Sequence, residues 1–182
     1  MTDGAPPALP RHTLSVLVEN TPGVLSRITA LFSRRGFNID SVTEGRTEHP
    51  AFSRLTLVVH AEPEALEQVA KQVGKLVNVL KVIELPPDTA LQRELVLVKV
   101  HSEGRTLSHI IEIVQLFRAK TVDVSPEAVT IEASGTTEKL EAMLRMLEQF
   151  GITELVRSGT IAIGRGPNSS SSSLVRRIDH AA

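Results

Sequence analysis

The sequence predicts an α+β chain built from two successive β-α-β-β-α-β units, and three observations support this fold class. Short runs of alternating or β-branched apolar residues, typical of strands, lie between longer runs whose apolar residues follow helical spacing. The order of these runs in the first half of the chain recurs in the second half. The two halves also share local sequence, LFSRRGFNIDSV against LFRAKTVDVS.

The first half begins with a strand and a helix. Arg11–Glu19 alternates and places Leu14, Val16 and Val18 on one face, which predicts a strand with one buried side. The following segment has its apolar residues on one helical stripe, and Gly36 directly after it is a typical helix stop. The stripe residues are Val24, Leu25, Ile28, Leu31 and Phe32.

A hairpin, a second helix and a fourth strand complete the first half. The β-rich runs Phe37–Glu44 and Phe52–Val59 flank the polar segment GRTEHPA, which predicts a hairpin with a long loop. Pro63 begins the second helix, because the first helical position does not need the N–H that proline lacks. Leu76–Leu85 is predicted to be the last strand of this unit.

The second half repeats the same order of elements. Its strands and helices have the same apolar spacing as those of the first half. The expected elements are a strand at Arg93–His101, a helix at Thr106–Arg118, strands at Thr121–Val124 and Ala128–Ala133, a helix at Lys139–Gln149, and a last strand within Ile152–Ile163.

This order predicts two domains of the ferredoxin-like plan, each with two helices on one face of a four-stranded antiparallel sheet. We expect a disordered lead-in at residues 1–10, a first domain at 11–86, a linker at 87–92, a second domain at 93–166 and a flexible, Ser-rich tail at 167–182. The other sheet face and the sheet edges would be uncovered, so we expect the chain to associate with itself.

Composition argues against several classes of function. The formal net charge is −1 and the chain has neither Trp nor Tyr, so we expect no nucleic-acid partner. The chain has no Cys, and it has no apolar segment of the ~20 residues that a bilayer crossing needs, so we expect no membrane association. Its opening, MTDGAPPALP, does not resemble a signal peptide, which favours a cytoplasmic location.

No residue pattern predicts catalysis or a resident metal. The six histidines are scattered, without the spacing to Ser or Thr and to an acid that a nucleophilic triad would suggest. His101 and His109 flank a strand-to-helix turn, so a metal site there is conceivable, but two partly exposed histidines explain the pair as well. Neither of the two common glycine-rich phosphate-binding motifs is present.

The turn between the first strand and the first helix is the most distinctive local feature. It reads Asn20-Thr21-Pro22-Gly23. We expect Thr21 to cap the helix, Pro22 to occupy its first position, and Gly23 to let a ligand approach the backbone. The alternative is that the four residues form a well-made turn without a ligand.

The N–H groups of about Gly23, Val24 and Leu25 would then lack partners at the positive end of a helix, where a carboxylate binds well. Asn38, at the start of the next strand, could accept a hydrogen bond from an ammonium group, and Ile39 could help to enclose an apolar side chain. The alternative for Asn38 is a hydrogen bond to its own backbone. The hypothesis specifies a small apolar α-amino acid as ligand.

The segment LSVLVENTPGVLSRITALFSRRGFNIDSV resembles the opening of an ACT domain, and specifically that of the small regulatory subunits of acetohydroxyacid synthase (acetolactate synthase). The resemblance continues through RELVLVKV and through LFRAKTVDVSPEAVTIEASGTTEKLEAMLRMLEQFGITELVRSGTIAIGRG. It covers roughly residues 11–166, with an ACT domain in the first half and an ACT-like domain in the second.

The resemblance implies a chain that is not itself catalytic and that carries no cofactor of its own. Its expected partner is the large catalytic subunit, which would use thiamine diphosphate, Mg²⁺ and FAD. The small subunit would raise the activity of that partner and confer feedback inhibition by branched-chain amino acids, above all valine. The resemblance also implies a homodimer that forms through the ACT domains, with the effector at their interface.

Carried onto this sequence, the family's effector site falls on two segments. The implied residues are Asn20, Thr21, Pro22, Gly23, Val24, Leu25, Asn38 and Ile39. The equivalent turn of the second half, VHSEGRTLS, lacks the Asn and the Pro, so one site per N-terminal domain is expected, and the C-terminal domain would serve the catalytic subunit or assembly. A free-standing amino-acid sensor and an enzyme of unrecognised type remain as alternatives.

Overall fold

The computed structural model describes residues 9–104 and 106–167 of the 182-residue chain. Contacts divide the chain into two compact units. Unit 1 contains the residues up to Leu91 and those from Ala162 onward, and unit 2 is Gln92–Ile161. Most of the predicted lead-in and nearly all of the predicted tail, residues 1–8 and 168–182, lie outside the described residues.

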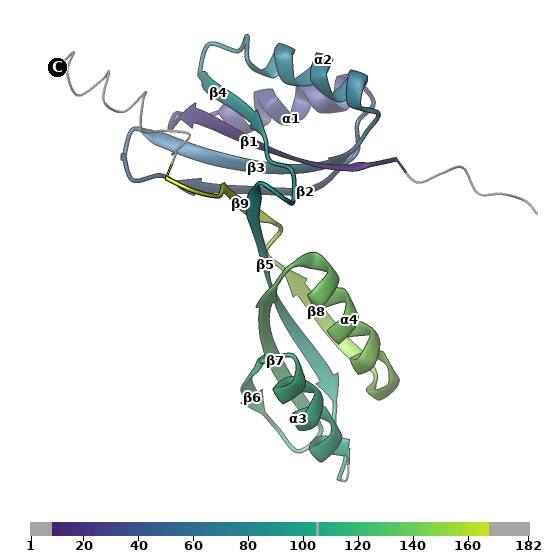
Figure 1. Ribbon diagram of the computed structural model, residues 1–182. Coiled ribbons are helices and arrows are strands. Elements are labelled where there is room, and N and C mark those ends of the chain that lie inside the picture. Colours follow the sequence, from purple (N-terminus) through teal and green to yellow (C-terminus); the bar gives the residue numbers. More distant parts are fainter. Residues whose placement is uncertain (1–8, 105, 168–182) are drawn as a thin grey trace, which may run out of the picture. The chain divides into compact units, whose positions relative to one another are not determined.

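Unit 1 has the predicted β-α-β-β-α-β order, and its helices α1 and α2 lie on the same face of the sheet (Figure 1). The strands form an antiparallel sheet in the order β2-β3-β1-β4, so β2 and β4 are its edges. The elements are β1 (Arg11–Glu19), α1 (Val24–Arg34), β2 (Ile39–Arg46), β3 (Phe52–His60), α2 (Pro63–Val73) and β4 (Val79–Glu84).

The core of unit 1 lies between the sheet and these two helices. Its members are the inward apolar residues that strand alternation and the helical stripes predict, and Phe32 of α1 packs edge-on against Phe37 with ring centroids 5.9 Å apart. The chain leaves α1 through Gly36, whose φ of 75° suits a residue without a Cβ. The N–H of Phe37 bonds to the carbonyl of Phe32 at 3.1 Å and closes the helix end.

The expectation that the second face of this sheet is uncovered is wrong for unit 1. Outward residues of β1 and β3 on that face are buried, including Thr13, Ser15, Leu17, Thr56 and Val58. A second, small apolar cluster also contacts this side of the sheet, and it joins Leu85, Ala90 and Ala162 to Ile83 of β4. The sequence did not reveal this cover because its members are few and come from distant segments.

Unit 2 follows the same plan, and its antiparallel strands run in the order β6-β7-β5-β8. This repetition confirms the predicted α+β fold class of two ferredoxin-like units. Beyond that plan, β9 (Ile161–Gly164), whose residues from Ala162 onward belong to unit 1, is a separate strand that pairs with β5, where the sequence suggested one final strand. The elements are β5 (Ala90–His101), α3 (Thr106–Leu116), β6 (Lys120–Val124), β7 (Ala128–Gly135), α4 (Thr137–Leu147), a 3₁₀ turn (Glu148–Phe150) and β8 (Ile152–Arg157).

The face of the unit 2 sheet away from its helices remains open. Val96, Val98 and Val100 of β5 point into the core beneath α3 and α4, while the alternate residues Leu95 and Leu97 are 40% and 38% exposed. The open face expected from the sequence therefore exists in unit 2, although unit 1 lacks it.

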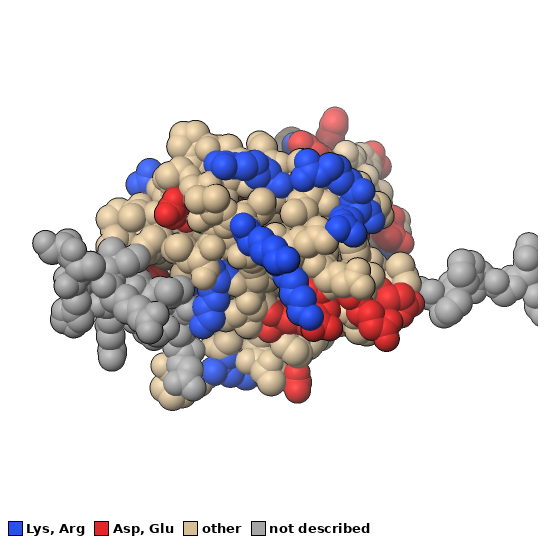
Figure 2. Space-filling view, turned by 90° about the horizontal axis from the view of Figure 1, so that it is seen from above, with Lys and Arg blue, Asp and Glu red and all other residues tan. Residues whose placement is uncertain are grey.

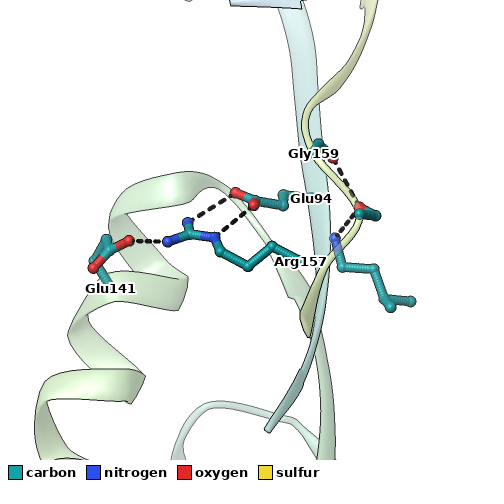
Figure 3. A network of polar contacts seen from close by, with 6 residues as sticks. Glu94, Glu141, Arg157 and Gly159 are labelled. Atoms are coloured by element: carbon teal, nitrogen blue, oxygen red, sulfur yellow. Dashed lines mark hydrogen bonds and ion pairs between the residues drawn. The ribbon is translucent and has the colours of Figure 1, made fainter. Parts of the chain in front are cut away.

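An arginine clamp holds three elements of unit 2 together (Figure 3). Arg157 of β8 donates from Nε and Nη2 to the two carboxylate oxygens of Glu94, at 2.7 Å and 3.1 Å, and from Nη1 to Glu141 of α4. Glu94 is only 7% exposed. The bond to Glu94, followed by the bond to Glu141, raises the pKa of the Arg157 guanidinium, against the opposing effect of its partial burial.

We expect Arg157→Met to lower the free energy of unfolding by about 3 kcal/mol, because the substitution leaves the Glu94 carboxylate buried without its partner. Chemical denaturation followed by circular dichroism measures this loss. Lys99→Met is the matched control, since it breaks the exposed Lys99–Glu154 pair, 2.8 Å long, and should cost much less. Equal losses in the two variants would show that the contacts of Arg157 contribute no more to the free energy of unfolding than an exposed ion pair does.

Candidate functional site

The turn that the sequence singled out connects the end of β1 to the start of α1. Gly23 is the N-cap residue of α1, with φ 82° and ψ 0°, and no side chain caps the helix. The expectations that Thr21 caps the helix and that Pro22 is its first residue are therefore wrong. The left-handed conformation of Gly23 changes the direction of the chain one residue before the helix begins, and this change displaces Thr21 from the capping position.

The first turn of α1 offers unneutralised positive charge. An α-helix leaves its first N–H groups without partners inside the helix, and α1 has neither a capping side chain nor an acidic residue in its first turn. The contrast with α4 is clear, because Thr136 accepts from the N–H of Lys139 there and Glu138 lies in the first turn. Arg27 adds a cation, and its Nε donates to the Gly23 carbonyl at 3.3 Å.

A hollow of about 400 Å³ lies at this turn. Six of the eight residues predicted for the site line it, namely Asn20, Thr21, Pro22, Gly23, Val24 and Leu25. The seventh lining residue is Glu44 of β2, which the sequence analysis did not select. The parallel course of β1 and β2 brings Glu44 to the hollow, a relation that no local motif reveals.

The other two predicted residues, Asn38 and Ile39, do not line this hollow. They precede and begin β2, while Glu44 lies near the end of that strand. A strand rises about 3.3 Å per residue, so roughly 16 Å of β2 separate Ile39 from Glu44. Ile39 packs against the core of unit 1, and the Asn38 amide donates to the side chain of Asp40 at 3.1 Å. The chain alone therefore brings together six of the eight residues.

A somewhat larger hollow, of about 460 Å³, lies between α2 and β4. None of the predicted site residues lines it. Two of its charged side chains, Lys71 and Glu67, bond to each other at 2.6 Å one turn apart on α2. We regard the hollow at Gly23 as the better ligand site, because its backbone donors have no such internal partners.

The equivalent turn of unit 2 has different chemistry. Glu103 stands at this turn, and its Oε1 pairs with Nε2 of His101 at 2.9 Å. The hydroxyl of Thr106, at the start of α3, accepts from the N–H of Glu103 at 2.9 Å. Glu103 belongs to the turn itself, whereas Glu44 reaches the Gly23 hollow from β2. A carboxylate at the start of α3 would therefore meet a side chain of its own charge within the turn, which makes the unit 2 turn a poor counterpart of the turn at Gly23.

Other kinds of site find little support in the described residues. No three His, Asp, Glu or Cys side chains among residues 9–104 and 106–167 lie close enough to hold a metal ion. Within the same residues, the helices fall short of the length and apolar content needed to cross a membrane. The view onto the helices of unit 1 shows Lys and Arg interspersed with uncharged surface, with most of the Asp and Glu toward the right and lower parts of the view and a few on the left (Figure 2).

Comparisons with known proteins identify the family of both halves of the chain. Residues 14–81 match the model for the AHAS small subunit-like ACT domain, and residues 93–166 match the model for the small subunit of acetolactate synthase. The acetolactate synthase small subunit of Mycobacterium leprae is 58% identical over 159 residues, which cover 87% of this chain and 94% of that protein. The chain belongs to the acetolactate synthase small-subunit family.

Two further relatives agree with this assignment. The probable acetolactate synthase small subunit of Methanothermobacter thermautotrophicus is 46% identical over 156 residues, covering 85% of this chain and 93% of that protein. The crystal structure of the small subunit from Thermotoga maritima has a TM-score of 0.81 and 39% identity, and it covers 88% of this chain and 100% of that one. Membership of this family confirms the resemblance and supports a regulatory, non-catalytic chain that works with a catalytic large subunit.

Proposed function

We propose that this chain raises the activity of the thiamine-diphosphate-dependent catalytic subunit of acetolactate synthase and makes it sensitive to feedback inhibition by valine. It would act in the cytoplasm, in the biosynthesis of branched-chain amino acids, and Mg²⁺ and FAD would be held by the catalytic subunit together with thiamine diphosphate. The observation that carries the proposal is the uncapped, acid-free start of α1 at a hollow between Asn20 and Glu44.

The hollow has complementary groups for both ends of an amino acid. The free N–H groups at the start of α1 suit the carboxylate, and the carboxylate of Glu44 suits the ammonium group. Val24 and Leu25 also line the hollow, and they supply apolar surface for an aliphatic side chain. This pattern favours a small apolar amino acid over a nucleotide or a sugar.

Helix-end binding alone is too weak for a metabolite sensor. An anion at a helix terminus gains roughly 0.3 to 2 kcal/mol, whereas a micromolar ligand needs about 8 kcal/mol. The remaining affinity must come from further polar contacts and from enclosure of the ligand. Asn38 and Ile39 would supply both, but they lie at the opposite end of β2 from this hollow.

A second copy of the chain resolves this separation. β2 is an edge strand, largely exposed, with β3 as its neighbour on one side. Antiparallel pairing of two β2 strands about a two-fold axis would set the start of each strand beside the end of the other. Asn38 of one copy would then lie near Glu44 and the Gly23 turn of its partner, which completes the site between the two chains.

The proposed dimer predicts the effect of a substitution at Val42, in the middle of β2. Val42 is 41% exposed, and Val42→Lys would place an ammonium group in the pairing region, so we expect the dimer dissociation constant to rise at least tenfold. Analytical ultracentrifugation measures this constant. Val77→Lys is the matched control, because Val77 is 91% exposed and lies outside β2. A dimer equally stable in both variants would place the interface elsewhere.

The proposed function is tested by acetolactate formation with the catalytic subunit alone, with this chain, and with this chain plus valine. We expect stimulation by the chain and its reversal by valine. Gly23→Asp should abolish the reversal and leave stimulation intact, because its carboxylate occupies the position of the ligand's carboxylate.

Gly23→Asn is the control for that variant, since Asn has nearly the shape of Asp, carries no charge, and tolerates the left-handed backbone of residue 23. We expect Gly23→Asn to retain more valine sensitivity than Gly23→Asp. Full valine sensitivity in Gly23→Asp would show that valine does not bind at this turn. Absence of any stimulation by the unmodified chain would contradict the regulatory function and favour a free-standing sensor.

A further inference from the structure

A line of polar contacts runs from Asn38 into the neighbouring strand. The Asn38 Nδ2 donates to Oδ1 of Asp40 at 3.1 Å, and the second carboxylate oxygen of Asp40 lies 2.7 Å from Nε2 of His60, at the end of β3. On its other side, Nδ1 of His60 is 2.8 Å from the carbonyl oxygen of Leu9. The three side chains thus form one connected group.

The contact with Asp40 determines which way the Asn38 amide faces. An ionised carboxylate can only accept hydrogen bonds, so the NH₂ group of Asn38 must point toward Asp40. The amide oxygen is then directed away from Asp40. In that orientation the amide presents an acceptor, which an ammonium group can use, and not a donor, which would repel it.

The contacts of His60 depend on its protonation. The Leu9 carbonyl and the Asp40 carboxylate are both acceptors, so His60 can donate to both only when each ring nitrogen carries a proton. When one proton is lost, one nitrogen presents a lone pair to an acceptor, and that contact becomes unfavourable. Imidazole is the side-chain group that ordinarily changes charge between pH 5 and 8, so a comparison across that range tests whether these contacts depend on the second proton.

Several charged groups surround His60 and enter any pH dependence. Asp40 faces it from β2, and Arg11 of β1 lies directly opposite in the strand register. Glu62 follows closely along the chain, before α2. One residue beyond Arg11, His12 contacts two acceptors of its own: Oε1 of Glu84 at 2.7 Å and the Ala61 carbonyl at 3.2 Å. His12 is therefore a second imidazole to control for.

We propose that Asp40 and His60 are positioning residues of the effector site, and that they make effector affinity fall as His60 loses its proton. Protonated His60 holds Asp40, and Asp40 holds the Asn38 amide with its oxygen toward the ligand's ammonium group. Deprotonation weakens the hold on Asp40, so Asn38 spends less time in the accepting orientation. This inference rests on the proposed function, since it assumes that Asn38 contacts the effector.

Calorimetric titration of the full-length chain with L-valine at pH 6.0 and pH 8.0 tests the proposal. We expect the wild-type affinity to fall about three- to tenfold between these values, the range that corresponds to one hydrogen bond of ordinary net strength. His60→Gln should bind valine with the same affinity at both pH values. Asp40→Asn should bind about tenfold more weakly at pH 6.0, because an amide at position 40 no longer fixes the direction of Asn38.

His12→Gln is the matched control, and it should keep the pH dependence of the wild type. The proposal would be overturned if valine affinity depended on pH in His60→Gln as it does in the wild type, or if Asp40→Asn bound valine with wild-type affinity. Either result would leave the proposed valine site intact. A wild-type chain that binds no valine at either pH would instead overturn the proposed function and this inference with it.

A measurement on the ligand-free protein further distinguishes a failure of this inference from a failure of the proposed function. The side-chain amide resonances of Asn38 in the free protein should follow the titration of His60, and this dependence should vanish in Asp40→Asn. Asn38 resonances that do not change with pH in the wild-type chain would contradict the coupling between His60 and Asn38, independently of the result for valine binding.

Discussion

The conformation of Gly23 is the constraint on which the candidate site depends. A φ of 82° at the residue before α1 starts the helix without any side-chain cap, and the first turn of α1 contains no acid to neutralise its positive end. The hollow at this turn would be an ordinary surface depression if Thr21 capped the helix, as Thr136 caps α4. The left-handed turn therefore preserves the backbone donors that a carboxylate ligand would use.

The direction of the β1-α1-β2 segment imposes a second constraint. Because β1 and β2 run parallel with α1 between them, the start of α1 and the start of β2 lie at opposite ends of the sheet. A single chain therefore cannot bring Asn38 to the turn at Gly23. Pairing of two β2 edges would do so, and it would place the ligand where two copies meet. A ligand so placed can shift the equilibrium between two arrangements of the subunits, which allosteric control requires.

Periodicity and turn chemistry predicted most of the fold, because the apolar stripes of α1 and the alternation of β1 follow directly from side-chain geometry. The capping role of Thr21 could not be predicted, since it depends on the φ of the following glycine. The cover on the second face of the unit 1 sheet was also missed, because Ala162 joins it from a distant segment.

The site residues also divide into those that the sequence predicted and those that it could not. Six of them are consecutive, so one motif identified them together, and the structure places all six around one hollow. Glu44 and the contact between Asp40 and His60 depend on how β2 and β3 are aligned, which the spacing of residues in the sequence does not specify. The position of Asn38 relative to the hollow likewise depends on the topology of the sheet.

The central claim is that each effector site combines the Gly23 turn of one chain with Asn38 of another. Valine binding to heterodimers of a Gly23→Asp chain and an Asn38→Ala chain, purified with two different affinity tags, tests it most directly. A two-fold dimer that shares its sites keeps one unaltered site in this heterodimer, although each variant homodimer has none. The account predicts that the heterodimer binds valine with wild-type affinity at half the wild-type stoichiometry. A heterodimer that binds no better than the two homodimers would contradict it, because every site would then be built within a single chain.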